Sequence, residues 1–434
     1  MSPEASMESL GTSCHGRNKD FLVTHFCAGI AGRKISPREL FSGQEQDWIF
    51  GELSRRVEAE TVYAPGERRT WRREHLSAED LEGIRRPRVD EFVFKRLRER
   101  GLKLDEVAPR WPDGHRFALC ITHDMDHVSR NNWQELWRRA VRQRTALPRP
   151  LGQGDWISSV DVLRGTATSL LRHYALPVPD RLAGIAEWMK IEDGSGFRST
   201  FYFFAGGVGD WHPWDMNYRF SDKVPFSGRA VQLREIMREL TCSGWEIGLH
   251  PSYHAAASLE WLREQKRLCE EASGQQVVSV RQHYLQYHPR LTPALQSEAG
   301  LLTDSTQGFN DMIGFRAGSC FPYLCWDHMR NITLPLLEVP LHVQDGPLMK
   351  GAASVDNAIQ ATFDLIDTVE SIGGCLVILW HPLWLATDEG LQVFRAVIKE
   401  AKHRNAWGCT VQQLASWWLT RTEGIIGEAN CSFR

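Results

Sequence analysis

The stretch that decides the fold lies between residues 117 and 127 and reads Phe117-Ala118-Leu119-Cys120-Ile121-Thr122-His123-Asp124-Met125-Asp126-His127. Its first half is apolar and partly β-branched, which is typical of a buried strand. The strand then ends in two carboxylates, Asp124 and Asp126, with an imidazole on either side. Two carboxylates that point the same way from one strand are costly unless a cation or a shared proton relieves them. Taken alone, the stretch fits an active-site edge and a solvated turn that caps a following helix equally well.

The rest of the chain favours the active-site reading, because several predicted strands also end in a polar residue. These strands are 245–249 before His250, 277–280 before Arg281, 300–303 before Asp304 and 375–380 before His381; a further strand is predicted at 199–204. Helices are predicted between them, at 231–240, 259–272, 293–299, 358–372, 391–402 and 411–419. Alternating strands and helices predict a parallel sheet, closed or nearly closed, with one functional rim.

Composition narrows the class of protein. The chain has 434 residues and a net charge of −3, which argues against a nucleic-acid binder that works by bulk charge. Seventeen tryptophans suit a protein that stacks sugar rings, although we prefer a role in the core for them. No apolar run is long enough to span a bilayer, and the ten cysteines contain no CxxC pair. We therefore expect a reduced, cytoplasmic protein, with peripheral contact to a membrane left open.

Four regions are expected along the chain. Residues 1–20 form a disordered tail and 21–110 a small accessory α/β region, in which Phe21-Leu22-Val23 and Trp48-Ile49-Phe50 are short strands. A catalytic domain covers 111–420, and 421–434 is a C-terminal tail. Within the segment 127–195, a basic helix at 133–144 is either a lid or anion-binding patch, or a solvated helix face, which we prefer.

His250-Pro251-Ser252-Tyr253-His254 places two imidazoles four residues apart. Pro251 keeps His250 out of a helix and suits the first position of a following one, so both imidazoles can face one point. Two imidazoles and one carboxylate make a three-ligand site with an open position for water, and Asp126 is the natural third ligand. Asp124 is then free to take a proton from that water, and His381 could protonate a leaving group.

The order of these motifs resembles the polysaccharide deacetylase family, also called the NodB homology domain or carbohydrate esterase family 4. The family's Thr-Phe-Asp-Asp motif is matched imperfectly by Thr122-His123-Asp124-Met125-Asp126, in the manner of a branch with a His-Asp-x-Asp motif. Its His-[Ser/Thr]-x-x-His motif is similar to residues 250–254, with Pro251 in the Ser/Thr position. Its Leu-x-His motif is similar to Leu379-Trp380-His381. The resemblance covers about 111–420.

The resemblance implies an α/β fold, a distorted (β/α) barrel of about seven strands. It implies Asp126, His250 and His254 as ligands of a divalent metal, zinc first, with cobalt, nickel or manganese as alternatives. Asp124 would be the base and His381 the acid. Arg281 would orient Asp124, and Asp304 would hold Arg281. The extra residue between Asp124 and Asp126 leaves open which of the two is base and which is ligand.

Arg316, in the Gly314–Gly318 loop, could bind substrate oxygens, and a surface turn is an equal alternative for this loop. For His123, His283, His342 and Asp345 we expect structural roles near the same rim. The function implied is a metal-dependent deacetylase that removes acetyl groups from N-acetylated sugars. A hydrolase of another C–N bond in a small amide, and a non-catalytic carbohydrate-binding protein with a decayed site, remain as alternatives.

Overall fold

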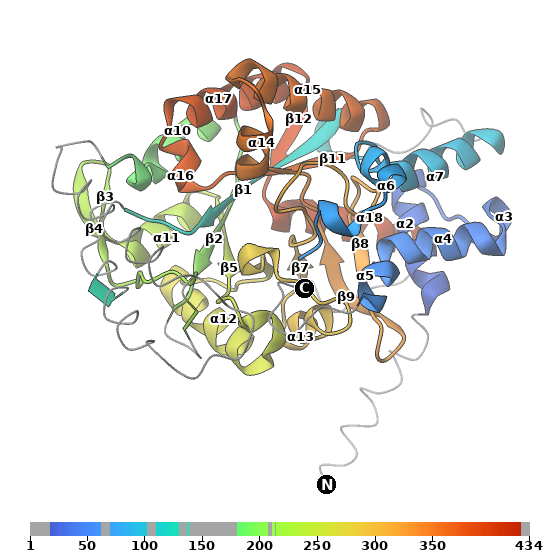
Figure 1. Cartoon of the computed structure of the whole chain (residues 1–434), viewed down its shortest axis with the longest axis horizontal. Coiled ribbons are helices and arrows are strands. Elements are labelled where there is room, and N and C mark those ends of the chain that lie inside the picture. The colour runs from blue at the N-terminus through green and yellow to red at the C-terminus, as the bar shows by residue number, and fades with distance from the viewer. Residues whose placement is uncertain are drawn as a thin grey trace, which may run out of the picture.

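The computed structural model describes residues 18–61, 70–101, 110–129, 137–138, 180–206, 211–212 and 214–426. Ten strands in this part of the chain form one curled sheet that makes a half-barrel (Figure 1). They are β1 (Phe117–Met125), β2 (Thr200–Phe204), β5 (Glu246–His250), β6 (Ser279–Val280), β7 (Thr303–Asp304), β8 (Tyr323–Asp327), β9 (Ile332–Glu338), β10 (Val343–Gln344), β11 (Cys375–Leu379) and β12 (Ala406–Cys409). A separate hairpin consists of β3 (Lys223–Phe226) and β4 (Arg229–Gln232).

The sheet is parallel except at one edge, and its strand order is β10-β11-β1-β2-β5-β6-β7-β9-β8. Only β8 and β9 pair antiparallel within it. The β12 strand pairs with the first half of β1 and β2 with the second half, while β11 covers the other side. All nine residues of β1 are buried as a result. Parallel pairing brings the carboxyl ends of these strands to one rim, as the sequence predicts.

Side chains fill the inside of the half-barrel. Gly248 in the middle of β5 faces the ring of Tyr202 on β2, and a Cβ at Gly248 would lie 2.5 Å from two of its ring carbons. Only glycine fits there, because real Cβ atoms do not approach other atoms so closely.

The predicted helices of the barrel are present, with ends that differ by a few residues. They are α11 (Leu233–Cys242), α12 (Leu259–Ser273), α13 (Thr292–Glu298), α15 (Val355–Ile372), α17 (Asp388–His403) and α18 (Val411–Ile426); α10 (Ile185–Asp193), α14 (Asp345–Gly351) and α16 (Pro382–Leu385) lie between the strands as well. In α11 the buried residues recur at the helical spacing, as Leu233, Ile236, Met237 and Leu240. Since α18 continues to Ile426, the expected tail at 421 begins too early.

The N-terminal region is helical, which corrects the expectation of an accessory α/β unit. Its helices are α2 (Lys19–Ala31), α3 (Pro37–Leu40), α4 (Gly43–Leu53), α5 (Arg56–Glu60), α6 (Ala78–Gly83) and α7 (Arg88–Glu99). The expected strands at 21–23 and 48–50 lie inside α2 and α4. Short apolar runs do not distinguish a strand from a buried helix, and most residues of α2 are buried. Gly29 lets Trp418 of α18 pack directly against α2, where a Cβ would lie 2.4 Å from its ring.

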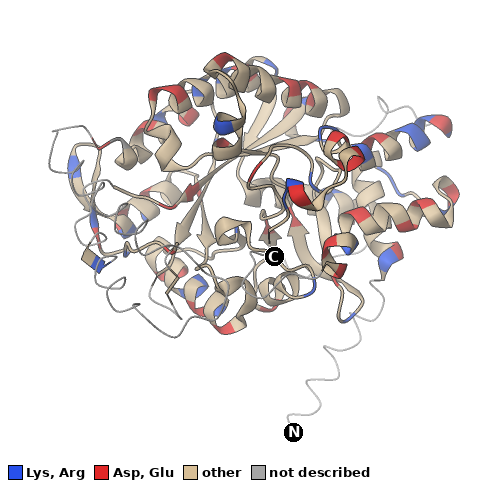
Figure 2. Cartoon of the chain, viewed as in Figure 1, with Lys and Arg blue, Asp and Glu red and all other residues tan. Residues whose placement is uncertain are grey.

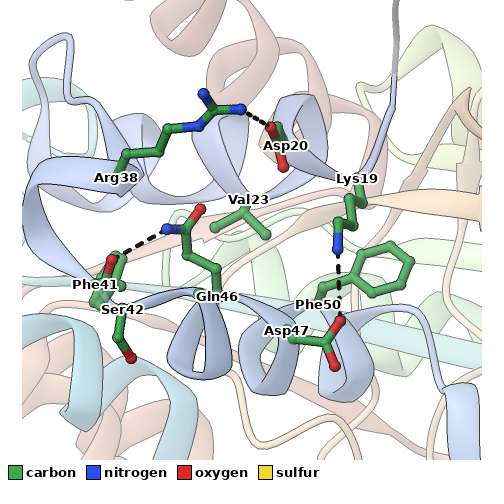
Figure 3. Close-up of a pocket in the computed structure, with 10 residues that line it drawn as sticks. Lys19, Asp20, Val23, Arg38, Phe41, Ser42, Gln46, Asp47 and Phe50 are labelled. Carbon is green, nitrogen blue, oxygen red and sulfur yellow. Dashed lines mark hydrogen bonds and ion pairs between the residues drawn. The ribbon is translucent and has the colours of Figure 1, made fainter.

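Charged residues of both signs are interspersed along the outer helices (Figure 2). A cavity of about 490 Å³ between α2 and α4 shows the same balance (Figure 3). Lys19 lies 3.7 Å from Asp47 across this cavity, and Arg38 lies 2.7 Å from Asp20. Each charge at the cavity therefore has an opposite charge beside it.

Some expectations concern residues outside the described ranges, namely the tail at 1–17, most of the basic helix at 133–144, and the last eight residues. No helix in the described part of the chain is both long and apolar enough to cross a bilayer.

Candidate metal centre

Three side chains meet at the rim of the sheet, at the carboxyl ends of β1, β5 and β6, with β2 between the first two strands. Asp126 follows β1, His250 is the last residue of β5, and His283 follows β6 in a single 3-10 turn (His283–Leu285). One ligand atom from each of them lies within 4.8 Å of the others. A carboxylate and two imidazoles at this spacing form the donor set of an open, three-ligand metal site.

The imidazoles are oriented as metal ligands are. His250 Nδ1 lies 2.7 Å from the Arg281 carbonyl oxygen and can donate only to it, which leaves the lone pair on Nε2. That Nε2 lies 3.3 Å from Asp126 Oδ1 and 3.9 Å from Asp124 Oδ2. His283 Nδ1 lies 3.4 Å from Asp215 Oδ1. In protein metal sites, a carbonyl or carboxylate bonded to the far nitrogen fixes the ring in this way.

Several buried polar atoms of the cluster have no hydrogen-bond partner in the described part of the chain. They are His283 Nε2 and Asp126 Oδ1; beside the cluster, Asp124 Oδ1, which faces Arg281, has none either. Buried polar atoms in proteins nearly always have a hydrogen-bond partner. Potential ligand atoms that lack one and converge on one point therefore call for an ion or a water. The residues present therefore fit a divalent cation.

The electrostatics favour positive charge at the same point. Burial opposes ionisation of Asp126, but the His250, His381 and His283 imidazoles around it hold its pKa well below the usual value. Burial likewise opposes charge on His250, yet the nearby Asp124 and Asp126 carboxylates raise its pKa. A cation bound here would supply the charge that these carboxylates attract.

His381 approaches from a different strand, since it follows β11 directly before α16. Its Nδ1 lies 2.8 Å from Asp345 Oδ1, and its Nε2 faces Asp126 Oδ2 at 3.8 Å. Burial alone would lower the pKa of His381, but the hydrogen bond and the charge of Asp345, together with the other two carboxylates, raise it to about 10. The Asp345 carboxylate thus fixes the ring so that Nε2 faces the cluster, a use of Asp345 that differs from the structural role expected of it.

Arg281 lies where it can orient Asp124, with Nη1 at 3.7 Å from Asp124 Oδ1. The expectation that Asp304 holds Arg281 is corrected. Ser305 accepts the Nε and Nη2 hydrogen bonds at 2.8 and 2.7 Å, and Thr122 accepts that of Nη1 at 2.9 Å. Asp304 instead accepts the backbone N–H of Thr306, and burial raises its pKa to about 6 beside the buried Glu338 carboxyl.

His254 is not part of the cluster, which corrects its expected role as a metal ligand beside Asp126 and His250. The chain turns after Pro251 without forming a helix, so the four-residue spacing does not return the side chain to the rim. His254 is exposed, and its ring lies 5.2 Å from that of His212. His283 takes the place of His254, although we expected a structural role for it. The available signal was its position two residues after Arg281, because both follow the same strand end.

Arg316 does not face the site either. It is buried with Nε 2.9 Å from Glu58 Oε1, and it donates from Nη1 to the Gly308 carbonyl at 2.8 Å. Arg55 binds the same Glu58 carboxylate. Because Glu58 belongs to α5, Arg316 joins the N-terminal helices to the barrel and is not available for substrate.

We expect the substitution Arg316→Met to lower the free energy of unfolding by about 3–5 kcal/mol, because it strips the buried Glu58 carboxylate of one partner. Chemical denaturation measures this loss, and the double variant Arg316→Met/Glu58→Leu should recover part of it. Unchanged stability together with a raised KM would return Arg316 to the substrate role.

Of the remaining rim residues, His342 is structural as expected. Its Nδ1 accepts the backbone N–H of Val377 at 3.1 Å and its Nε2 lies 3.2 Å from the Ser319 carbonyl. Burial lowers the pKa of His342 to about 4, so the ring is neutral and serves both partners.

No protein-family model and no curated protein sequence matches the chain. Among solved structures, a proposed polysaccharide deacetylase from Mycobacterium smegmatis is 20% identical, with a TM-score of 0.46, over 72% of this chain and 93% of that one. PuuE allantoinase is 16% identical, with a TM-score of 0.47, over 72% and 93%. A polysaccharide deacetylase assigned as probable, from Pseudomonas aeruginosa PAO1, is 17% identical, with a TM-score of 0.44, over 72% and 94%.

The fold and the site together define a class: an α/β half-barrel with a candidate Asp-His-His metal centre at the carboxyl ends of its strands.

Proposed function

We propose that the chain is a metal-dependent hydrolase that removes the acetyl group from an N-acetylated amino sugar. The observation that carries the proposal is the convergence of Asp126, His250 and His283, with Asp124 and His381 beside them. A bound divalent cation, zinc first, would supply Lewis acidity toward the amide carbonyl and make a water molecule more acidic.

The residues of the chain divide the remaining work. Asp124, within 3.9 Å of His250 Nε2 and 3.7 Å of Arg281 Nη1, is placed to take the proton from the attacking water. His381 carries a proton that Asp345 stabilises, and its Nε2 points at the cluster. It is therefore the group that donates to the amine as the C–N bond breaks. The products are acetate and a free amino sugar.

An aromatic wall beside the cluster supports a sugar as the substrate. We define it as Trp214, Tyr253 and Tyr284, whose rings lie 5.0 Å (Trp214–Tyr284) and 5.3 Å (Trp214–Tyr253) apart. It adjoins the cluster because the rings of Tyr284 and the candidate ligand His283 are 4.7 Å apart. Asp215 also links the aromatic wall to the cluster, since the Oδ1 that faces His283 accepts the backbone N–H of Tyr253 at 2.7 Å. Flat aromatic faces suit the C–H face of a pyranose ring.

Replacement of Trp214 by Ala is expected to raise KM for an N-acetylated glycan about 10-fold, the order of one lost stacking contact. Turnover of a small N-acetyl amide without a ring should be unchanged, and Trp214→Phe should retain most of the glycan affinity. Steady-state kinetics on both substrates gives the comparison. Equal losses on both substrates would mean that the wall supports the fold and not the sugar.

The proposal as a whole is tested by acetate release across a panel of N-acetylated glycans, after addition of zinc, cobalt, nickel or manganese to metal-stripped protein. We expect release from at least one glycan, dependent on the metal. If the protein released amine from small amides but from no glycan, the proposed substrate would be a small amide and not a sugar. Metal and glycan binding without any product would favour a carbohydrate-binding protein.

A further inference from the structure

His123 is a fully buried histidine that the proposed reaction does not use. It precedes Asp124 on β1, and neighbouring residues of a strand point to opposite faces. Its ring accordingly packs behind the site against the rings of Phe201, Trp188 and Phe394, at centroid distances of 4.6, 5.8 and 5.8 Å. The ring therefore cannot reach the cation site.

Both nitrogens of the His123 ring face oxygen acceptors. Nε2 lies 2.7 Å from Glu192 Oε1, and Nδ1 lies 3.1 Å from the carbonyl oxygen of Trp380. The Glu192 carboxylate is itself fixed, because its other oxygen accepts hydrogen bonds from Ser199 Oγ at 2.7 Å and Trp245 Nε1 at 2.6 Å. His123 is thus a rigid donor aimed at one backbone carbonyl.

That carbonyl belongs to the peptide bond between Trp380 and His381. The N–H of the same peptide bond donates to Asp345 Oδ2. His123 and Asp345 therefore hold the two polar groups of one peptide unit, one from each side. Since the plane of this peptide sets the direction in which the His381 side chain leaves the backbone, both residues act on the aim of His381.

We propose that His123, supported by Glu192, is a positioning residue that holds the Trp380–His381 peptide so that His381 Nε2 faces the metal cluster. The effect on turnover rests on the proposed function, in which His381 is the proton donor. The effect on the His381 ring does not depend on it.

Two substitutions separate this role from a merely structural one. In His123→Asn the amide nitrogen stands close to the position of Nδ1, so the donor to the Trp380 carbonyl is kept and the bond to Glu192 is lost. In His123→Gln the amide reaches the position of Nε2, so the bond to Glu192 is kept and the Trp380 carbonyl loses its donor.

We expect His123→Gln to lower kcat about 10- to 100-fold with KM and metal content unchanged, the size of a small misplacement of a reacting group. His123→Asn should stay within about 3-fold of the unsubstituted protein, well inside that range.

A spectroscopic readout keeps the test independent of activity. The ring nitrogen signals of His381, assigned by comparison with a His381→Gln variant in ring-labelled protein, should shift in His123→Gln and stay in place in His123→Asn. If His123→Asn, and not His123→Gln, lowered kcat or shifted these signals, the proposal would be overturned and His123 would be a partner for Glu192 alone. If the unsubstituted protein released no product from any substrate, the proposed function would fail, and the ring signals would still decide the positioning role.

Discussion

The His283→Ala protein is expected to lose its metal ion and its turnover, whereas His254→Ala keeps its metal. His283 offers a buried Nε2 without a hydrogen-bond partner in the described part of the chain, and Asp215 lies behind its other nitrogen. Removal of one of three ligands should weaken metal binding by at least about 100-fold, more than the loss of an outer partner usually costs. His254 is exposed and lies outside the cluster, so its loss leaves all three donors in place.

Elemental analysis of the purified variants, followed by metal titration into stripped protein, gives the result. His250→Ala is a positive control, because its Nε2 lies 3.3 Å from Asp126 Oδ1. Metal retained in His283→Ala and lost in His254→Ala would restore the ligand set that the sequence motif implies.

Asp124→Asn is expected to keep its metal and lower kcat by about a thousand-fold, within the range of general base catalysis. An asparagine keeps the shape of the side chain and an oxygen for Arg281, but it cannot take a proton at neutral pH. Asp126→Asn, by contrast, should lose the metal, because Asp126 carries the carboxylate oxygen of the cluster.

Metal content and kcat measured on both variants decide which carboxylate plays which role. Loss of metal in Asp124→Asn, with retention in Asp126→Asn, would exchange the two assignments. Loss of metal in both would make the two carboxylates joint ligands and leave the base to another group.

The fold could be predicted from the sequence where one residue pattern has one structural meaning. The strand before Asp124 and the strand before His250 are confirmed in β1 and β5. Sequence patterns failed where local chemistry was ambiguous. The apolar run around Leu22 fits a strand as well as a buried helix, and in the structure it is a helix that packs against Trp418.

The site was predicted in part for a similar reason. A strand end fixes where a side chain starts, so Asp126, His250 and His381 could be placed on one rim. The path of the chain after Pro251 depends on contacts such as that of the Tyr253 N–H with Asp215, from a distant segment. No local spacing encodes such a contact. The path of the chain after Pro251 nevertheless decides whether His254 or His283 joins the cluster.

The buried join between Arg316 and Glu58 has a practical consequence for work with this protein. The N-terminal helices share one continuous hydrophobic core with the barrel, from Phe26 to Trp418. A shortened clone that begins near Trp111 would expose an apolar surface and leave the buried Arg316 guanidinium without its Glu58 partner. Insoluble material from such a clone would reflect the cut and not a property of the whole chain, so assays should start from a chain that keeps these helices.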